Sequence, residues 1–318
     1  MFVTGGTGFI GTWLIESLLW ARREYCLDVE ICILSREPQR FLASASPLIK
    51  TSDVAFQTGD VRDFTFPSGR FTHIIHAATE ASARLNADAP FEMLDTIVGG
   101  TKRVCLFATH SGAKILLNTS SGGVYGPQPT DMANVGEEYY GAPDPMDPLA
   151  VYSESKRLSE MIGRISSEAS GFEHKVARIT ALVGPRLPLN IHYAMGNFIR
   201  DALRGGPIII KGNGTPVRSY MYIADLVIWL WIIFIHGKSN RPYNVGSETG
   251  ISLSEAASAV CCAFETSIAV VVQNRVLNDG RPNRYVPSTQ RAQSELGLRQ
   301  WIDFPSAIQR TVDWYRLQ

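Results

Sequence analysis

The stretch that decides the fold opens the chain: Thr4-Gly5-Gly6-Thr7-Gly8-Phe9-Ile10-Gly11. Three of its glycines recur at every third position, a spacing typical of the first strand-to-helix turn of an α/β fold that binds a dinucleotide. Gly5 permits the tight turn, Gly8 lets the backbone approach a pyrophosphate, and Gly11 allows the helix to pack close to the strand. A glycine-rich turn that binds nothing is the alternative. The predicted cofactor contacts here are Gly5, Gly8, Phe9, Ile10 and Gly11.

Short β-rich runs alternate with helical patterns through about residue 182, as in parallel βαβ units. We expect strands near 2–4, 29–35, 54–58, 73–77, 114–119 and 175–182, and helices at 10–23, 91–111 and 150–170. The pattern predicts a Rossmann-type doubly wound parallel sheet. Because the first strand is unusually short, residues preceding Met1 could be missing from this numbering.

After Gly184, prolines and glycines recur between short predicted elements. This pattern predicts a smaller, irregular α/β lobe that binds the substrate. We therefore divide the chain into a dinucleotide-binding domain at 1–182 and a mainly substrate-binding lobe at 183–318. A segment around 220–250 is expected to cross back to the first domain.

Composition excludes several classes of partner. Thirty Lys plus Arg balance thirty Asp plus Glu, so no basic field exists to hold nucleic acid or an anionic membrane. The longest apolar run, 227–235, is shorter than the ~20 residues that span a bilayer. It is expected in a buried helix that starts near Asp225. Five cysteines without metal-site spacing favour a reducing cytoplasm and predict no metal site.

The end of the second predicted strand carries Ser35 and Arg36, with Arg40 one turn later. An acidic residue there usually binds the ribose hydroxyls of NAD, whereas serine and arginine can donate to the extra phosphate of NADP. NADP(H) is therefore favoured over NAD(H), unless Arg36 only starts a solvated loop. Asp60 and Val61 follow the third strand, where the carboxylate either accepts from the adenine amino group or forms a turn.

Tyr152 and Lys156 lie four residues apart, on one face of a predicted helix. A neighbouring ammonium favours the phenolate, so this tyrosine could exchange a proton with a hydroxyl or a ketone while a cofactor exchanges the hydride. Ser121 follows the fifth strand, at the sheet edge where ligands of open α/β folds bind. It is the hydroxyl best placed to hydrogen-bond the reacting oxygen.

Together these motifs resemble the extended short-chain dehydrogenases, the NAD(P)-dependent epimerase/dehydratase group that acts on nucleotide sugars, over nearly the whole chain. The resemblance implies a catalytic triad of Ser121, Tyr152 and Lys156, with Lys156 also contacting the nicotinamide ribose. It further implies that His76-Ala77-Ala78 lines the cofactor, with Ala77 and Ala78 in contact.

In the second lobe the resemblance assigns the grip on the sugar-nucleotide diphosphate to Arg218, Asn197 and Arg281. Surface salt bridges are the alternative for the two arginines. A homodimer formed by the helices at 91–111 and 150–170 is also implied. One family asparagine is replaced by Ala181, and His192 either reaches the sugar as an acid or is a plain surface residue.

Two departures narrow the reaction. The family's 4,6-dehydratases carry an Asp-Glu pair directly after the triad hydroxyl, where this chain has Gly122 and Gly123, so dehydration is disfavoured. The 4-epimerases retain NAD and usually carry the acidic residue that Ser35 replaces. We therefore expect an NADPH-dependent reductase of a nucleotide-linked 4-keto-6-deoxy sugar, an oxidoreductase of deoxysugar biosynthesis. The alternatives are a 4-epimerase with tightly bound NAD and a non-catalytic NADP-binding scaffold or sensor.

Overall fold

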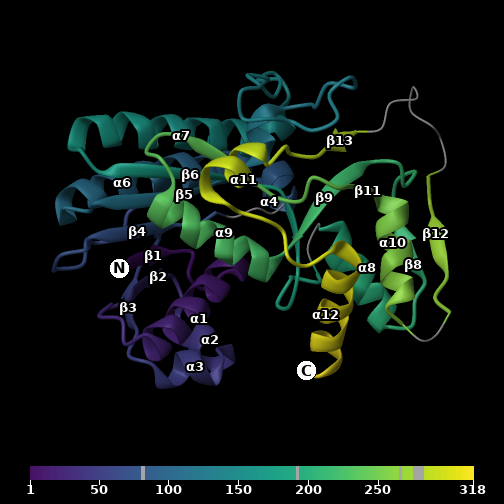
Figure 1. Cartoon of the computed structure of the whole chain (residues 1–318), viewed down its shortest axis with the longest axis horizontal. Helices are drawn as coiled ribbons and strands as arrows, with labels where there is room; N and C mark the ends of the chain where they lie inside the picture. The colour runs from purple at the N-terminus through teal and green to yellow at the C-terminus, as the bar shows by residue number, and fades with distance from the viewer. Residues whose placement is uncertain (80–82, 191–192, 265–266, 275–282) are drawn as a thin grey trace. The chain divides into compact units, whose positions relative to one another are not determined.

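The computed structural model describes residues 1–79, 83–190, 193–264, 267–274 and 283–318 (Figure 1). His192 and Arg281 lie outside the described residues. The chain forms two compact units. The first contains Met1–Val124, Asp144–Arg178 and Leu230–Pro242, and the second contains Tyr125–Pro143, Ile179–Trp229 and Tyr243–Gln318.

A seven-stranded sheet with strand order β10-β6-β5-β4-β1-β2-β3 is the frame of a Rossmann-type α/β fold. Its strands are β1 (Phe2–Thr4), β2 (Cys32–Ser35), β3 (Ala55–Thr58), β4 (His73–His76), β5 (Ile115–Ser121), β6 (Glu173–Ile179) and β10 (Pro242–Val245). In the middle of the sheet Val3 pairs in parallel with Ile33 on one side and with Ile75 on the other. The predicted fold class is confirmed, and so are the first five predicted strands.

The helices of the first unit cover both faces of this sheet, with α1 on one face and α6 and α7 on the other (Figure 1). They are α1 (Phe9–Glu24), α2 (Pro38–Ser44), α3 (Pro47–Thr51), α4 (Ala83–Asp88), α5 (Pro90–Leu94), α6 (Gly100–Ser111) and α7 (Val151–Ser170), with short helical turns η1 (Asp95–Gly99), η2 (Gly122–Tyr125) and η3 (Pro148–Ala150). α7 buries mainly small residues, and at Gly163 an added Cβ would lie 2.2 Å from the ring of His174. α7 therefore packs close to the sheet.

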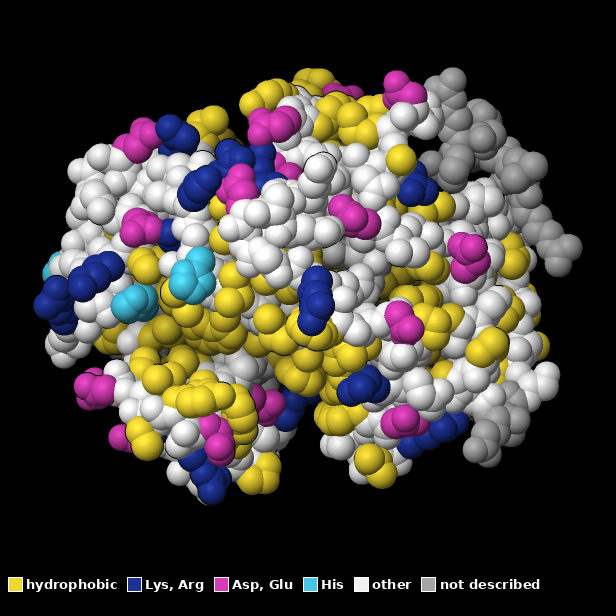
Figure 2. All heavy atoms as spheres, viewed as in Figure 1, with side chains coloured by type: hydrophobic (Ala, Val, Ile, Leu, Met, Phe, Trp, Pro, Cys, Tyr) yellow, Lys and Arg dark blue, Asp and Glu magenta, His cyan; other side chains and the backbone are white. Residues whose placement is uncertain are grey.

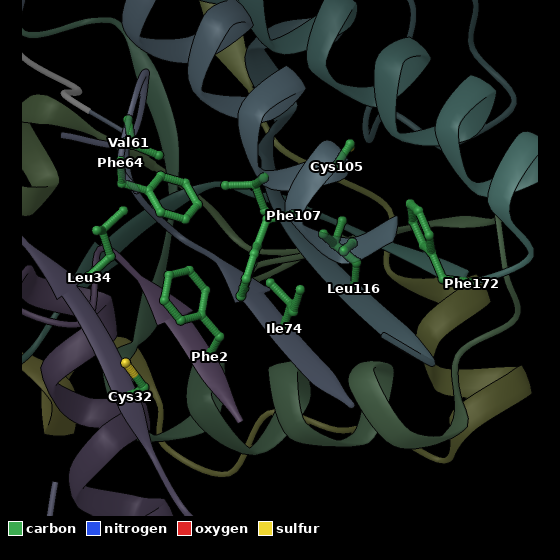
Figure 3. Close-up of a cluster of buried hydrophobic side chains, with 12 residues drawn as sticks. Phe2, Cys32, Leu34, Val61, Phe64, Ile74, Cys105, Phe107, Leu116 and Phe172 are labelled. Atoms are coloured by element: carbon green, nitrogen blue, oxygen red, sulfur yellow. The ribbon is translucent and has the colours of Figure 1, made fainter. Parts of the chain in front are cut away.

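The apolar core between the sheet and α6 is rich in phenylalanine (Figure 3). The ring of Phe2, from β1, lies 4.6 Å from that of Phe107 and 5.5 Å from that of Phe64. Arg103 places its guanidinium 4.0 Å from the ring of Phe66 and donates to the Phe64 carbonyl. This core fixes β1, and with it the glycine turn that follows.

Two predicted elements were wrong in detail. The helix expected at 91–111 is interrupted by η1, a π-helical turn, and Gly100 there lets α6 approach Val61, since an added Cβ would lie 2.9 Å from that side chain. The strand expected at 175–182 ends at Ile179, and β7 (Ala181–Val183) pairs with β9 instead of continuing. Between them Thr180 donates its backbone N–H to the Val245 carbonyl of β10, and its hydroxyl lies 3.2 Å from the Ser219 hydroxyl of β9, so the chain passes from one sheet to the other at this residue.

The second unit is the irregular α/β part, built on a four-stranded sheet and a two-stranded sheet. Its elements are β7, α8 (Ala194–Leu203), β8 (Ile208–Ile210), β9 (Val217–Tyr222), β11 (Gly250–Ser252), α10 (Leu253–Cys262), β12 (Val270–Val272), β13 (Arg284–Tyr285), α11 (Gln290–Leu296) and α12 (Phe304–Arg316). β9 is central, because β7, β11 and β13 all pair with it.

The apolar run that includes Trp229 lies in α9 (Ile223–His236), which starts two residues before Asp225. Trp229 is fully buried, and Asp225 accepts hydrogen bonds from the backbone of Trp301 and Ile302. None of the helices in the described part of the chain has the length and apolar character needed to cross a membrane. On the face shown in Figure 2, Lys and Arg side chains lie interspersed with Asp and Glu side chains, as the balanced composition predicts.

Candidate active site

A cavity of about 540 Å³ lies in the first unit, where β1, β2, β3 and β4 end. This is the carboxyl edge of a parallel sheet, the usual ligand site of open α/β folds. The cavity is lined by Gly5, Thr7, Gly8, Leu34, Ser35, Arg36, Gly59, Asp60, Val61, Ala77, Ala78, Thr79, Leu85, Asp88, Glu92 and Thr96. Eight predicted cofactor residues therefore share one cavity: Gly5, Gly8, Ser35, Arg36, Asp60, Val61, Ala77 and Ala78.

The glycine turn leaves no room for side chains at two of its positions. Gly5 has a φ of +71°, and a Cβ there would lie 2.4 Å from the Ala77 carbonyl. A Cβ at Gly11 would lie 2.0 Å from the Gly5 carbonyl oxygen. The N-cap residue of α1, Gly8, lines the cavity and offers no side-chain cap. The first backbone N–H groups of α1 therefore remain available to an anion, as a pyrophosphate site requires.

The polar groups at the ends of β2 and β3 have local partners. The Ser35 hydroxyl accepts from the Glu37 backbone N–H at 3.2 Å. Arg36 lines the cavity, whereas the exposed Arg40 lies outside it in an ion pair with Glu37 at 3.0 Å. Of the described residues that line the cavity, Arg36 alone is a cation.

Arg62, which the sequence analysis missed, binds Asp60 through two nitrogens at 2.8 and 3.1 Å. Hydrogen bonding to this guanidinium lowers the pKa of Asp60, and the charge of Arg36 contributes in the same direction. The carboxylate therefore stays ionised at the cavity wall. The spacing of Asp60 and Arg62, two residues apart after a strand, was the available signal.

A buried hydrogen-bond chain behind the cavity wall runs through His76. Thr101 donates to the Ile97 carbonyl at 2.6 Å, so its oxygen accepts from His76 Nε2, 3.2 Å away. His76 Nδ1 then accepts from the Thr4 hydroxyl at 2.8 Å, and that oxygen accepts from the Ala78 N–H. Burial lowers the pKa of His76 to about 3, so the ring is neutral. This series of hydrogen bonds links Ala78, in the cavity wall, to Thr4 on β1 and Thr101 on α6.

The three predicted catalytic residues meet at the end of β5 and the start of α7. Burial raises the pKa of Tyr152. A hydrogen bond with Ser121 lowers this pKa by a smaller amount. Lys156 is buried and donates to the Thr119 carbonyl and to the Thr79 hydroxyl, each at 2.7 Å. Since Thr79 lines the cavity, the three predicted catalytic residues are contiguous with the cavity. Burial lowers the pKa of Lys156 to about 7, against the charge of Glu160.

The segment after Ser121 supplies no second acid and base. The Gly123 N–H donates to the Ser121 hydroxyl oxygen at 3.1 Å. A Cβ at Gly123 would lie 2.8 Å from the Ser153 hydroxyl, so an acidic side chain there would displace the helix residue beside Tyr152. The close contacts of Gly123 with Ser121 and Ser153 therefore require a residue without a side chain at this position.

The predicted substrate residues in the second unit have separate partners. Arg218, on β9, donates to the carbonyls of Val217 and Asn283 at 2.9 and 2.8 Å, and burial lowers its pKa. These two acceptors are neutral carbonyls, so they do not neutralise the positive charge of Arg218. Asn197, on α8, accepts from Arg200 at 2.8 Å. The structure thus does not join Asn197 and Arg218 in one hydrogen-bonded group.

Comparison with known proteins agrees with the fold. The family model of the NAD dependent epimerase/dehydratase family matches residues 1–246, and the chain belongs to this family. UDP-glucuronic acid decarboxylase 1 of Xenopus tropicalis is 26% identical over 317 residues, covering 99% of this chain and 72% of that protein.

Two solved structures share the fold across the chain. The UDP-glucose 4-epimerase of Thermus thermophilus in complex with NAD has a TM-score of 0.81 and 26% identity, covering 99% of this chain and 98% of that one. The dTDP-glucose 4,6-dehydratase of Streptomyces venezuelae, with NAD and TYD bound, has a TM-score of 0.84 and 24% identity, covering 99% and 96%. These findings support a nicotinamide-dependent enzyme of the nucleotide-sugar type.

Proposed function

We propose that the protein is an NADPH-dependent reductase of a nucleotide-linked 4-keto-6-deoxy sugar. The observation that carries the proposal is the group of Ser121, Tyr152 and Lys156, followed by glycines where elimination would need an acid and a base. Reduction of a ketone needs one hydride and one proton. The group can supply the proton, and it holds no second proton-transfer pair for dehydration at 122 and 123.

Each side chain of this group has a separate task in the proposal. Ser121 donates a hydrogen bond to the C4 ketone oxygen and holds it beside Tyr152. Tyr152 transfers its phenolic proton to that oxygen as C4 becomes an alcohol. The ammonium of Lys156 stabilises the resulting phenolate. When bound, NADPH supplies the hydride to C4.

The proposed preference for NADP(H) depends on Ser35 and Arg36. Both line the cavity, and Arg36 can donate bidentately to a phosphate dianion. Asp60, the acidic residue at the end of β3, is already bound by Arg62 and is proposed to face the adenine. The N-terminus of α1 fits the pyrophosphate, because its N-cap residue Gly8 lines the cavity and no side chain caps the first N–H groups.

For the sugar nucleotide we propose a diphosphate site in the lobe at 183–318, with Arg218, Asn197 and Arg281 as its ligands and 1–182 as the cofactor domain. The names of the relatives, which act on UDP- and dTDP-linked sugars, support this substrate class. A neutral protein needs such local cations to hold a diphosphate, because its net charge supplies no attraction.

We further propose a cytoplasmic homodimer that pairs through α6 and α7. Four apolar side chains of these helices are 40–60% exposed, a pattern that a partner helix pair would cover: Leu106, Leu158, Met161 and Ile165. Light scattering should give the mass of a dimer. A charged residue at Met161 should convert it to a monomer.

A redox-neutral reaction is the second candidate, favoured by the identity to a decarboxylase and to an epimerase solved with NAD. Such an enzyme would oxidise C4, act on the keto sugar, and reduce it again on the same cofactor. It should form product without added cofactor and co-purify with NAD. A non-catalytic NADP-binding scaffold should bind NADPH and turn over neither type of substrate.

The deciding assay mixes the purified protein with NADPH and a panel of UDP- and dTDP-linked 4-keto-6-deoxy sugars. Absorbance of the reduced nicotinamide follows the reaction. The proposal expects loss of NADPH in equal amounts to the alcohol formed at C4. No oxidation with any member of the panel would exclude the reductase.

A further inference from the structure

Glu160, which is one turn after Lys156 on α7, has a role that the three-residue catalytic group does not include. Its carboxylate accepts from the Ser120 hydroxyl at 2.5 Å and from Arg178 at 3.0 and 2.7 Å. The side chains of Glu160 and Arg178 are only 15% and 14% exposed. Ser120 immediately precedes Ser121. The carboxylate therefore holds the residue next to the proposed catalytic hydroxyl.

This contact is one of three that align the end of β5 with α7. Asn118 donates to the Ser159 hydroxyl at 3.2 Å, Lys156 donates to the Thr119 carbonyl, and Ser120 donates to Glu160. Consecutive residues of β5 are thus bound to one face of α7. The next residue of the strand, Ser121, meets Tyr152 from that same helix.

We infer that Glu160 is a positioning residue: it fixes Ser120, and thereby Ser121, against α7, and it holds a negative charge one turn from Lys156 on the same helix. This rests on the proposed function in that it assigns proton transfer to Tyr152. A residue that acts through the strand end and the lysine in this way needs no contact with substrate.

Among the residues that the structure describes, the charges around Lys156 leave the task of raising its pKa to Glu160. From β4, His76 is neutral, because burial lowers its pKa to about 3. From β6, burial lowers the pKa of His174 to about 4, and Arg178 pairs with Glu160 itself.

On α7 itself, Tyr152 is neutral because its pKa is raised, and Glu154 forms an ion pair with Arg157 at 3.6 Å. Burial lowers the pKa of Lys156 to about 7, and within the described part of the chain Glu160 is the charged group that raises it. Removal of the Glu160 charge should therefore lower the pKa of Lys156 further.

Carbon-13 NMR of protein labelled at lysine Cε measures this titration directly and needs no substrate. The chain has seven lysines, so Lys156 can be assigned from the signal that a Lys156→Arg variant loses. Glu160→Gln keeps an acceptor for Ser120 but removes the charge, and its Lys156 midpoint should fall by about one pH unit. Ser120→Ala removes the hydrogen bond but keeps the charge, and should leave the midpoint unchanged.

Two further variants keep the result interpretable. Glu154→Gln removes a charge from the same helix and should leave the Lys156 midpoint unchanged. Glu160→Gln combined with Arg178→Leu removes both charges of the buried pair and avoids an unpaired guanidinium, so it should give a smaller downward shift than Glu160→Gln in a stable protein. An unshifted midpoint in Glu160→Gln, or an equal shift in Glu154→Gln, would overturn the inference.

Kinetics then separate the two parts of the role. Ser120→Ala should lower kcat, by up to about 100-fold, with little change in KM and no change in the pH at which activity falls on the alkaline side. Glu160→Gln should move that alkaline fall to lower pH. If no ketone is reduced but the NMR midpoint shifts, the reductase is excluded and the effect of Glu160 on Lys156 stands. If the wild type reduces a ketone and the midpoint does not shift, the inference alone fails.

Discussion

The cofactor cavity of the first unit and the predicted diphosphate residues of the second unit were inferred from the same kind of motif, yet they differ in how the structure assembles them. Eight predicted residues line one cavity in the first unit. In the second unit Arg218 and Asn197 have separate partners, and Arg281 lies outside the described residues. A turn that binds a dinucleotide depends on backbone conformation, and the positions of glycines in the sequence reveal that conformation directly. A diphosphate site made of arginine and asparagine depends on the directions of long side chains, which the sequence does not encode.

The largest effect should come from the catalytic group that borders the cavity. Tyr152→Phe removes the proton donor and should lower kcat by about 10²–10⁴-fold, while the dissociation constant for NADPH stays nearly unchanged. Single-turnover absorbance and fluorescence titration measure the two quantities. Retained turnover would mean that another residue transfers the proton.

The next effect tests the backbone part of the comparison. Gly5→Ala places a Cβ where only 2.4 Å separates it from the Ala77 carbonyl, so the variant should lose NADPH binding. Gly112→Ala is the matched control, because Gly112 also has a positive φ, +65°, but no atom lies within 4 Å of its added Cβ. The control should bind NADPH normally, with a modest loss of stability from its backbone conformation. Equal loss of binding in both variants would show that strain, and not the close contact, is responsible.

A third variant tests the choice of cofactor. Arg36→Glu should weaken NADPH binding by tenfold or more, as loss of a charge-assisted hydrogen bond of about 1.5–3 kcal/mol implies, and should leave NADH binding little changed or improved. Arg40→Glu makes the same charge change on an exposed residue outside the cavity. Calorimetry with both nucleotides checks the prediction. An unchanged NADPH to NADH ratio in Arg36→Glu would remove the basis for NADP preference.

The smallest effect is expected in the second unit. Arg218→Gln should raise KM for the sugar nucleotide by about tenfold, from loss of a charge-assisted contact, with NADPH affinity unchanged. If KM is unaffected, Arg218 is only structural, held by the carbonyls of Val217 and Asn283. In that case the binding residues would be predictable from the sequence only in the first unit.

The sequence predicted the sheet, and the proximity of Ser121 to Tyr152 and Lys156, because period and spacing encode them. It missed the π-helical turn at Asp95–Gly99 because helices lie directly on both sides of it, at Pro90–Leu94 and Gly100–Ser111. It missed the sheet change at Thr180 because that change depends on partners distant in sequence, Val245 and Ser219. Arg62 and Glu160 were missed for a similar reason. Each is a charged residue of ordinary appearance in the sequence, and only its partner in the folded chain reveals its role.

The measurement that tests the central claim most directly is the fate of NADPH when the protein meets nucleotide-linked 4-keto-6-deoxy sugars. If the protein is an NADPH-dependent reductase, NADPH is consumed in equal amounts to the C4 alcohol formed, and the purified protein requires added cofactor. Product formed without added cofactor, by protein that co-purifies with NAD, would contradict it.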